Sequence, residues 1–308
     1  MSAALVALML VFLLVFSFPA IKFNGSNILS GIVWNIGNQY GSGSVTHHGV
    51  SAQPGATFGG FVFVYGTLVT SALAMLFGVP TSVLVALALV YRVPRRLRLL
   101  ANATVELMAG VPSVVYGLWG IVVLVPWIGQ HVEPFLEGYF PHVPFLSGVA
   151  GSGNGLLASG IILAIMVIPV MVATMRDVIV AQPASIFEAS MALGSTTWQA
   201  VTRAILPSVR TGVAAAVLVA LGRALGETMA VLMVSGAAIN QLPSNIFQAV
   251  NTIAAVIVSQ LDSALTDSSG VAQRSLAELA LLLFLITLAV NIVARIILHG
   301  ADRIHQRP

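Results

Sequence analysis

Two charged residues inside an apolar segment have the clearest chemical meaning. Arg223 lies near the middle of the stretch 212–236, and Glu227 follows four residues later. On a helix this spacing places both side chains on one face, where they can neutralise each other. Intramembrane charges are costly, so they face a bundle interior or a water-filled path. The pair is therefore either a structural ion pair or a transport site.

In the transport interpretation, Arg223 meets an anion, because a guanidinium binds phosphate or carboxylate through two parallel hydrogen bonds. Glu227 then either holds Arg223 while the path is empty or becomes protonated, and the sequence leaves both roles open. Gly222 and Gly226 are also four residues apart. This stripe of small residues predicts close packing by a neighbouring helix.

A second functional candidate is the hydrophilic stretch 176–210, which is about 35 residues long. A loop of this length in a compact protein is usually functional. Apolar residues recur at nearly helical spacing before Gly194, and glycine is the preferred residue just past a helix end. The pattern predicts a short helix outside the membrane that docks its apolar face on a partner.

The composition identifies the elements that must position these residues. Hydrophobic residues make up 58% of the 308 residues and charged residues only 7%, which excludes an ordinary soluble enzyme and indicates an all-α polytopic membrane protein. The chain has no cysteine, so disulfides, iron–sulfur clusters and thiolate metal sites are excluded. Lys22 is the single lysine, so a phosphate-binding loop ending in Gly-Lys is excluded. We expect no catalytic site, no metal site and no cofactor in this chain.

Hydropathy predicts six transmembrane helices. The apolar segments span about 3–18, 61–91, 99–128 (broken by Pro112), 155–175, 212–236 and 276–298. We interpret the first as an uncleaved span, because it lacks a preceding basic residue and a clear cleavage site. The predicted division is an N-terminal helix with an extracytoplasmic loop (1–60), a transmembrane domain (61–300) and a tail (301–308).

The basic residues predict the orientation. Most arginines fall in the loops 92–98 and 176–210 and in the tail. Six spans place all of these on one side, and basic loops remain cytoplasmic. Both termini are therefore predicted to be cytoplasmic. The cluster Arg92–Arg98 is a topology determinant that can also contact anionic membrane lipid.

The loop 176–210 resembles the cytoplasmic EAA loop of ABC importer permeases. That motif reads Glu-Ala-Ala, three residues, Gly, nine residues, Ile, one residue, Leu-Pro. It is matched by Glu188, Ala189, Gly194, Leu206 and Pro207, with departures at Ser190 and Ala204. The resemblance implies a type I importer permease fold, in which this loop forms the coupling helix that sits in a cleft of a separate ATPase subunit.

Two further segments resemble phosphate-specific (Pst) permeases of the PstC type. They are GRALGETMAVLMVSG, which contains Arg223 and Glu227, and PSVVYG, which contains Ser113 and Tyr116. The resemblance implies that Arg223 and Glu227 lie along the substrate pathway, with Ser113, Tyr116 and Glu106 as weaker candidates near the broken third span. Glu106 is equally suited to pair with the Arg92–Arg98 cluster. It also implies four partners: a PstA-type sister permease, two PstB-type ATPase subunits that use ATP and Mg, and a PstS-type phosphate-binding protein. The implied location is the inner (cytoplasmic) membrane of a prokaryote.

Other functions remain open on the residues alone. Arginine does not distinguish phosphate from sulfate, molybdate or phosphonate. A stand-alone secondary anion transporter would also use intramembrane charges, although it would need no EAA loop. His47 and His48 are adjacent without a nearby carboxylate, which disfavours a metal site, and nothing in the sequence indicates a nucleic-acid partner.

Overall fold

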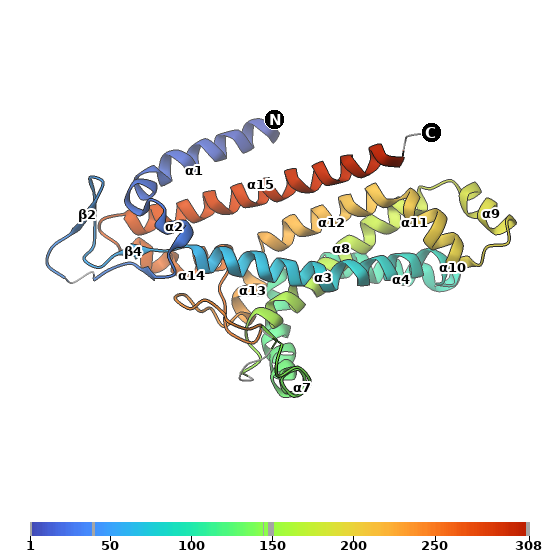
Figure 1. Cartoon of the computed structure of the whole chain (residues 1–308), viewed down its shortest axis with the longest axis horizontal. Helices are drawn as coiled ribbons and strands as arrows, with labels where there is room; N and C mark the ends of the chain where they lie inside the picture. Colours follow the sequence, from blue (N-terminus) through green and yellow to red (C-terminus); the bar gives the residue numbers. More distant parts are fainter. Residues whose placement is uncertain (1, 39–40, 144, 147–150, 306–308) are drawn as a thin grey trace.

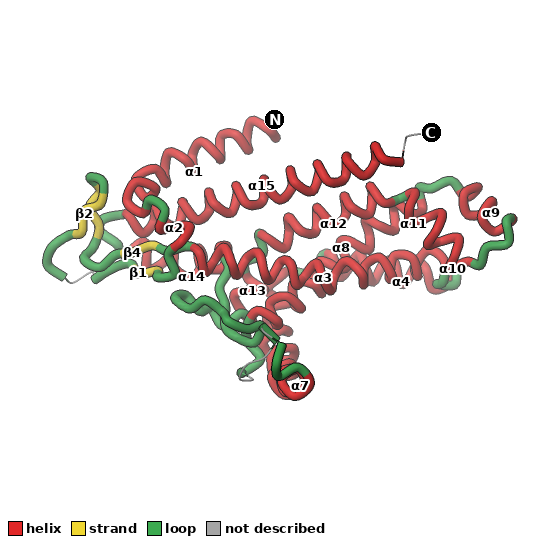
Figure 2. Tube along the Cα trace, in the orientation of Figure 1, coloured by secondary structure: helices red, strands yellow, loops and turns green. Residues whose placement is uncertain are grey.

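The computed structural model describes residues 2–38, 41–143, 145–146 and 151–305. Helices dominate these residues (Figures 1 and 2). Their bounds are α1 (Ser2–Asn24), α2 (Asn27–Ser30), α3 (Phe61–Tyr91), α4 (Arg95–Ala109), α5 (Ser113–Trp119), α6 (Val125–Trp127), α7 (Glu133–Tyr139), α8 (Leu156–Val180), α9 (Ala184–Ala192), α10 (Thr197–Ala200), α11 (Leu206–Ser208), α12 (Arg210–Leu225), α13 (Met229–Val234), α14 (Ile253–Leu265) and α15 (Val271–His305). Three π-helical turns are η1 (Gly120–Leu124), η2 (Ile128–Val132) and η3 (Val201–Ile205).

The π-helical turns share one cause in the sequence. Each ends two residues before a proline, namely Pro126, Pro134 and Pro207. A proline has no N–H and its ring clashes with the carbonyl four residues earlier, so the preceding turn widens. The predicted break at Pro112 therefore lies before the third span, which runs from Ser113 to Tyr139 and carries π-helical turns ahead of Pro126 and Pro134.

The membrane-spanning elements agree with a six-span protein. Among the described residues, five helices are long and apolar enough to cross a membrane, and a bent pair raises the number to six. The bent pair joins 197–208 to α12 with an angle of 71° between them. The fold is thus helical and polytopic, as predicted, with the fifth span entered through a bend.

The predicted third and fifth spans were wrong in position. The third covers Ser113–Tyr139 instead of 99–128, because α4 is a separate amphipathic helix that packs against α8. Glu133 and Glu137, expected in a loop, therefore lie in α7. The fifth span ends at Leu225, and the chain then turns into the short helix α13.

Helix α8 forms the centre of the bundle. In its most apolar window 72% of the residues are buried, against 11% for α1 at the periphery. It packs along α3 through small residues, since a Cβ on Gly160 would lie 2.6 Å from the Cβ of Leu73. In a membrane, helices associate through such close van der Waals packing. The short helix α14, which sequence reasoning missed, packs against α15.

The N-terminal helix is attached to the last one. α1 lies along α15 (Figure 1), and the Asn24 side chain donates hydrogen bonds to Glu278 (2.6 Å) and Ser275 (3.1 Å). The segment after α1 was expected to be a loop. It contains two small antiparallel sheets, which pair β1 (Trp34–Asn35) with β4 (Thr57–Phe58) and β2 (Val45–His47) with β3 (Val50–Ala52).

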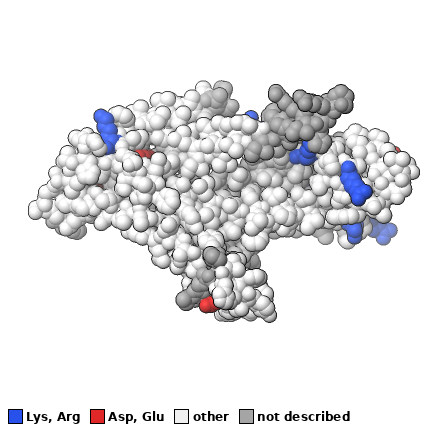
Figure 3. Space-filling view, in the orientation of Figure 1, with Lys and Arg blue, Asp and Glu red and all other residues white. Residues whose placement is uncertain are grey.

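The ends of the molecule differ in charge. On the face seen in Figure 3, basic side chains gather around the end that carries α9 and α10, and the middle is almost free of charge. The N-terminal end of α1 and the C-terminal end of α15 point toward this same basic end (Figure 1). Residues 301–305 continue α15 and do not form a separate tail, while 306–308 lie outside the described residues. The sidedness in a membrane stays a prediction.

Candidate functional site

Arg223 and Glu227 do not form the ion pair that their spacing suggests. Arg223 is exposed in the last turn of α12, and that helix ends at Leu225. Glu227 therefore leaves the helical face, and its Oε1 accepts a hydrogen bond (3.4 Å) from the N–H of Ala230 in α13. The ion pairs found within the described residues all involve Arg176. The expectation failed because four-residue spacing needs a continuous helix.

Within the described residues, no helix packs on Gly222 and Gly226. No atom of another element lies within 4 Å of a Cβ built on Gly222, and Gly226 follows the end of α12. The close approach occurs at Gly117 on α5 instead. A Cβ there would lie 2.7 Å from the Sδ of Met233 and 3.1 Å from the Cα of Ala230. Gly117 therefore allows α13 to pack on α5, a role that sequence reasoning missed.

Tyr116 is buried on α5, at the start of the third span. The Tyr116 hydroxyl donates a hydrogen bond to the carbonyl oxygen of Met108 (2.9 Å), which fixes the start of the third span against the end of α4. Ser113 is half-buried in the first turn of α5, directly after Pro112.

Glu106 has a different partner from those considered in the sequence. Its carboxylate lies 3.2 Å from the guanidinium of Arg176, which also binds Asp177 at 2.8 Å. The Arg176–Glu106 pair joins α4 to the end of α8. Glu106 is thus an inter-helix contact between α4 and α8.

The predicted coupling loop folds as two short helices at the basic end. Helix α9 ends at Ala192, and Gly194 has φ +83°, the left-handed conformation that glycine tolerates best. The N–H of Gly194 donates to the carbonyl of Met191 (3.0 Å). Thr196 then caps α10 reciprocally with Gln199. The predicted helix end at Gly194 is confirmed.

Helix α9 presents one face and anchors the other. Phe187 stacks on Tyr91 at the end of α3, with ring centroids 5.3 Å apart. Glu188 and Ala189 are exposed, and Leu193 keeps 88% of its surface accessible. An exposed leucine beside a carboxylate and a small residue is a surface suited to a protein partner. Residues 176–180 belong to α8, so the loop itself is shorter than predicted.

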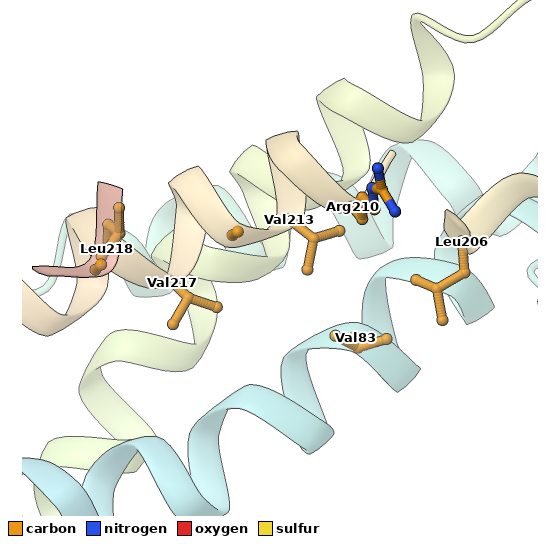
Figure 4. Close-up of a pocket in the computed structure, with 8 residues that line it drawn as sticks. Val83, Leu206, Arg210, Val213, Val217 and Leu218 are labelled. Carbon is orange, nitrogen blue, oxygen red and sulfur yellow. The ribbon is translucent and has the colours of Figure 1, made fainter. Parts of the chain in front are cut away.

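Leu206 and Pro207 lie where the coupling segment enters the fifth span. Leu206 lines a largely apolar cavity of about 480 Å³ bounded by α3, α11, α12 and α15 (Figure 4). Val83, Val213 and Val217 line the same cavity, with Arg210 beside them. Pro207 is exposed in α11, directly before the 71° bend. Both residues therefore occupy the hinge between the coupling segment and α12.

The adjacent histidines attach the segment after α1 to the end of that helix. His47 stacks on Phe23, with centroids 4.9 Å apart, and His48 Nδ1 lies 3.0 Å from the carbonyl oxygen of Lys22. In the parts of the chain that the structure describes, no group of three His, Cys, Asp or Glu side chains could hold a metal.

The chain matches known transport proteins over most of its length. Residues 78–303 match the model of the family "Binding-protein-dependent transport system inner membrane component". The phosphate transport system permease protein PstC 1 of Mycobacterium tuberculosis is 46% identical over 279 residues, which cover 90% of this chain and 82% of that protein. PstC of Haemophilus influenzae is 34% identical, covering 96% and 87%.

The fold agrees with these relatives. A bacterial ABC transporter that imports the acidic polysaccharide alginate contains a chain with a TM-score of 0.53 and 18% identity, over 78% of this chain and 79% of that one. The chain therefore belongs to the family of inner-membrane permease components of binding-protein-dependent transporters. Within this family it belongs to the PstC-type permeases.

Proposed function

We propose that this chain is the PstC-type permease subunit of an ATP-driven phosphate importer in the inner membrane of a prokaryote. The identity of 46% to a PstC protein over 90% of the chain carries the proposal. Inorganic phosphate would pass between this chain and a PstA-type sister permease. A PstS-type protein would deliver it, and two PstB-type subunits would hydrolyse ATP with Mg. The chain itself would contribute no catalytic group.

Arg223 is the residue that we propose to meet phosphate. Because it is exposed and makes no ion pair with Glu227, its guanidinium is available for an oxyanion. The other proposed pathway residues are Tyr116 and Ser113 of α5 and Glu227. Glu188, Ala189 and Gly194 are the proposed contacts to the ATPase, with Leu206 and Pro207 transmitting movement to α12.

The cargo is tested by the ATPase turnover of the complete complex in lipid. The binding protein is supplied loaded with phosphate or with sulfate, and we expect stimulation by the phosphate-loaded form alone. Stimulation by sulfate would keep the transporter class and overturn the phosphate assignment. Transport by the isolated chain, without an ATPase, would overturn the class and favour a stand-alone carrier.

The pathway is tested by Arg223→Gln. Loss of a charge-assisted hydrogen bond to the anion predicts phosphate uptake about 10- to 100-fold lower, with the complex still assembled. Arg274→Gln is the matched control, since it removes an arginine from the first turn of α15. Equal uptake by the two variants would show that Arg223 does not meet the substrate, and dissociation of the Arg223→Gln complex would assign it a structural role.

A further inference from the structure

A cavity of about 430 Å³ lies at the basic end of the molecule, between the C-terminal ends of α3 and α8 and the first half of α4. Its lining is of two kinds. Leu89 and Val90 of α3 are apolar, while Arg98 and Asn102 of α4 and Arg176 and Asp177 of α8 are polar. A site with one apolar and one charged side fits an amphiphile better than a free ion.

Two residues that line this cavity, Arg98 and Asn102, each have a buried polar atom without a partner. The Nε of Arg98 and the Oδ1 of Asn102 are buried and make no hydrogen bond among the described residues. The other end of the Arg98 guanidinium is held, because one of its NH₂ groups donates to the carbonyl of Val90 (2.7 Å). A buried polar group without a partner is costly. A fitting ligand therefore carries a hydrogen-bond acceptor for the Nε–H of Arg98 and a hydrogen-bond donor for the Oδ1 of Asn102.

The charges of the site limit the ligand further. Arg98 and Arg176 of the lining are positive and Asp177 is negative. Glu106 lies outside the lining, but its carboxylate pairs with Arg176 and brings the second negative charge. These four charges balance, which favours a zwitterion. The anionic group of the ligand would lie at Arg98, and its cationic N–H donors would lie at Asn102 Oδ1 and near Asp177.

The surroundings place this site at a membrane surface. α4 leaves Leu99 and Leu107 80% and 74% exposed, and the cavity adjoins the ends of two membrane-spanning helices. An amphipathic helix with exposed leucines and several arginines is typical of the lipid interface. The available amphiphile with a phosphate and an ammonium that donates hydrogen bonds is a phosphatidylethanolamine lipid.

We infer that the cavity between α3, α4 and α8 binds the headgroup of phosphatidylethanolamine, with the phosphate on Arg98 and the ammonium on Asn102. Arg98 also lines a smaller cavity of about 260 Å³ that reaches Phe187 and Glu188 of α9. The bound headgroup therefore stabilises the residues on which α9, the proposed coupling helix, packs.

The lipid itself supplies the sharpest test. The complete transporter is placed in nanodiscs of phosphatidylethanolamine with phosphatidylglycerol, or of phosphatidylcholine with phosphatidylglycerol, and retained lipid is counted by native mass spectrometry. Phosphatidylcholine has the same charge and phosphate but no N–H donor. We expect about tenfold stronger retention of phosphatidylethanolamine, the effect of one charge-assisted hydrogen bond. Equal retention of the two lipids, or preferential retention of phosphatidylglycerol, would overturn the inference.

Variants locate the lipid. Arg98→Gln and Asn102→Leu should abolish the preference for phosphatidylethanolamine, whereas Arg96→Gln, an exposed arginine on the same helix, should keep it. A preference that survives Arg98→Gln, or disappears in Arg96→Gln, would overturn the site. An effect of added inorganic phosphate in place of the lipid would identify a free anion site instead. Retention is measured without transport, so it is independent of whether phosphate is the cargo.

Discussion

At the scale of single residues, a substitution of Gly194 tests coupling to the ATPase while the permease stays folded. Its φ of +83° is unfavourable for other residues, and nothing lies within 4 Å of a Cβ built there. Gly194→Val should therefore strain the backbone by about 1–2 kcal/mol without a clash. We expect the end of α9 to shift and phosphate-stimulated ATPase activity to fall several-fold, with the permease still folded.

Gly43→Val is the matched control for this prediction. Gly43 also has a positive φ (+111°) and open space around it, but it lies in the N-terminal segment between β1 and β2. Wild-type coupling in Gly194→Val, or the same loss in both variants, would show that the effect is not specific to the coupling segment.

Asp267 gives a prediction about pH. Burial alone raises the pKa of this carboxyl, but hydrogen bonds from the N–H groups of Ala272 and Ser269 and from the Ser269 hydroxyl outweigh it, so the pKa is lowered. A lowered pKa contributes stability that is present above the unfolded pKa of about 3.9 and is lost as the pH falls through the folded value. Asp267 thereby stabilises the first turn of α15.

Asp267→Asn should lower the unfolding temperature by a few degrees at pH 7, since it weakens a helix cap worth about 1 kcal/mol. The difference from the wild type should shrink as the pH is lowered below 4. Asp262→Asn, an exposed carboxylate on α14, should have no such effect. A difference between Asp267→Asn and the wild type that stays constant from pH 7 to pH 3 would contradict the assigned role.

At the scale of elements, sequence reasoning succeeded where the signal is local. The helix 61–91 was predicted with the bounds it has, because it is a continuous apolar run with clear ends. The helix end at Gly194 was predicted because the left-handed conformation of a residue just past a helix depends on the local backbone, and glycine adopts it most easily. The third span was misplaced, because the leucines of α4 continue the apolar run while facing outward on an amphipathic helix.

The Arg223–Glu227 pair failed for a reason that lies outside local sequence. The break after Leu225 exists because α13 turns back to pack on α5 at Gly117. Such a contact joins segments more than 100 residues apart, and the hydrophobic pattern of neither segment indicates it. The break nevertheless supports the proposed role of Arg223 in phosphate binding, because it leaves the arginine exposed.

The position of the segment 235–252 depends on another close contact that the sequence does not indicate. A Cβ on Gly66 of α3 would clash with the backbone carbonyl of Asn251, and the N–H of Ile253 donates to the Thr67 hydroxyl (2.9 Å). Gly66→Ala should therefore displace the segment and lower the unfolding temperature markedly. Gly222→Ala, where a Cβ meets no atom within 4 Å, should leave the unfolding temperature of the permease unchanged. Equal unfolding temperatures for the two variants would contradict this packing.

At the scale of the whole molecule, the class of fold followed from composition alone, because so few charges cannot cover a water-facing surface. The small sheets after α1 and the bend before α12 did not follow, since both depend on contacts between distant segments. The gathering of basic side chains at the α9 end (Figure 3) agrees with cytoplasmic loops on that side.

The orientation can be tested directly because the chain contains no cysteine. Ser44→Cys and Ser268→Cys place a thiol on exposed positions near the strands and before α15, and Ser185→Cys places one on α9. A membrane-impermeant maleimide should label the first two in intact cells. It should label Ser185→Cys only in inverted vesicles from which peripheral subunits have been stripped with urea. Labelling of Ser185→Cys in intact cells would reverse the orientation, move both termini outside and remove α9 from any contact with an ATPase.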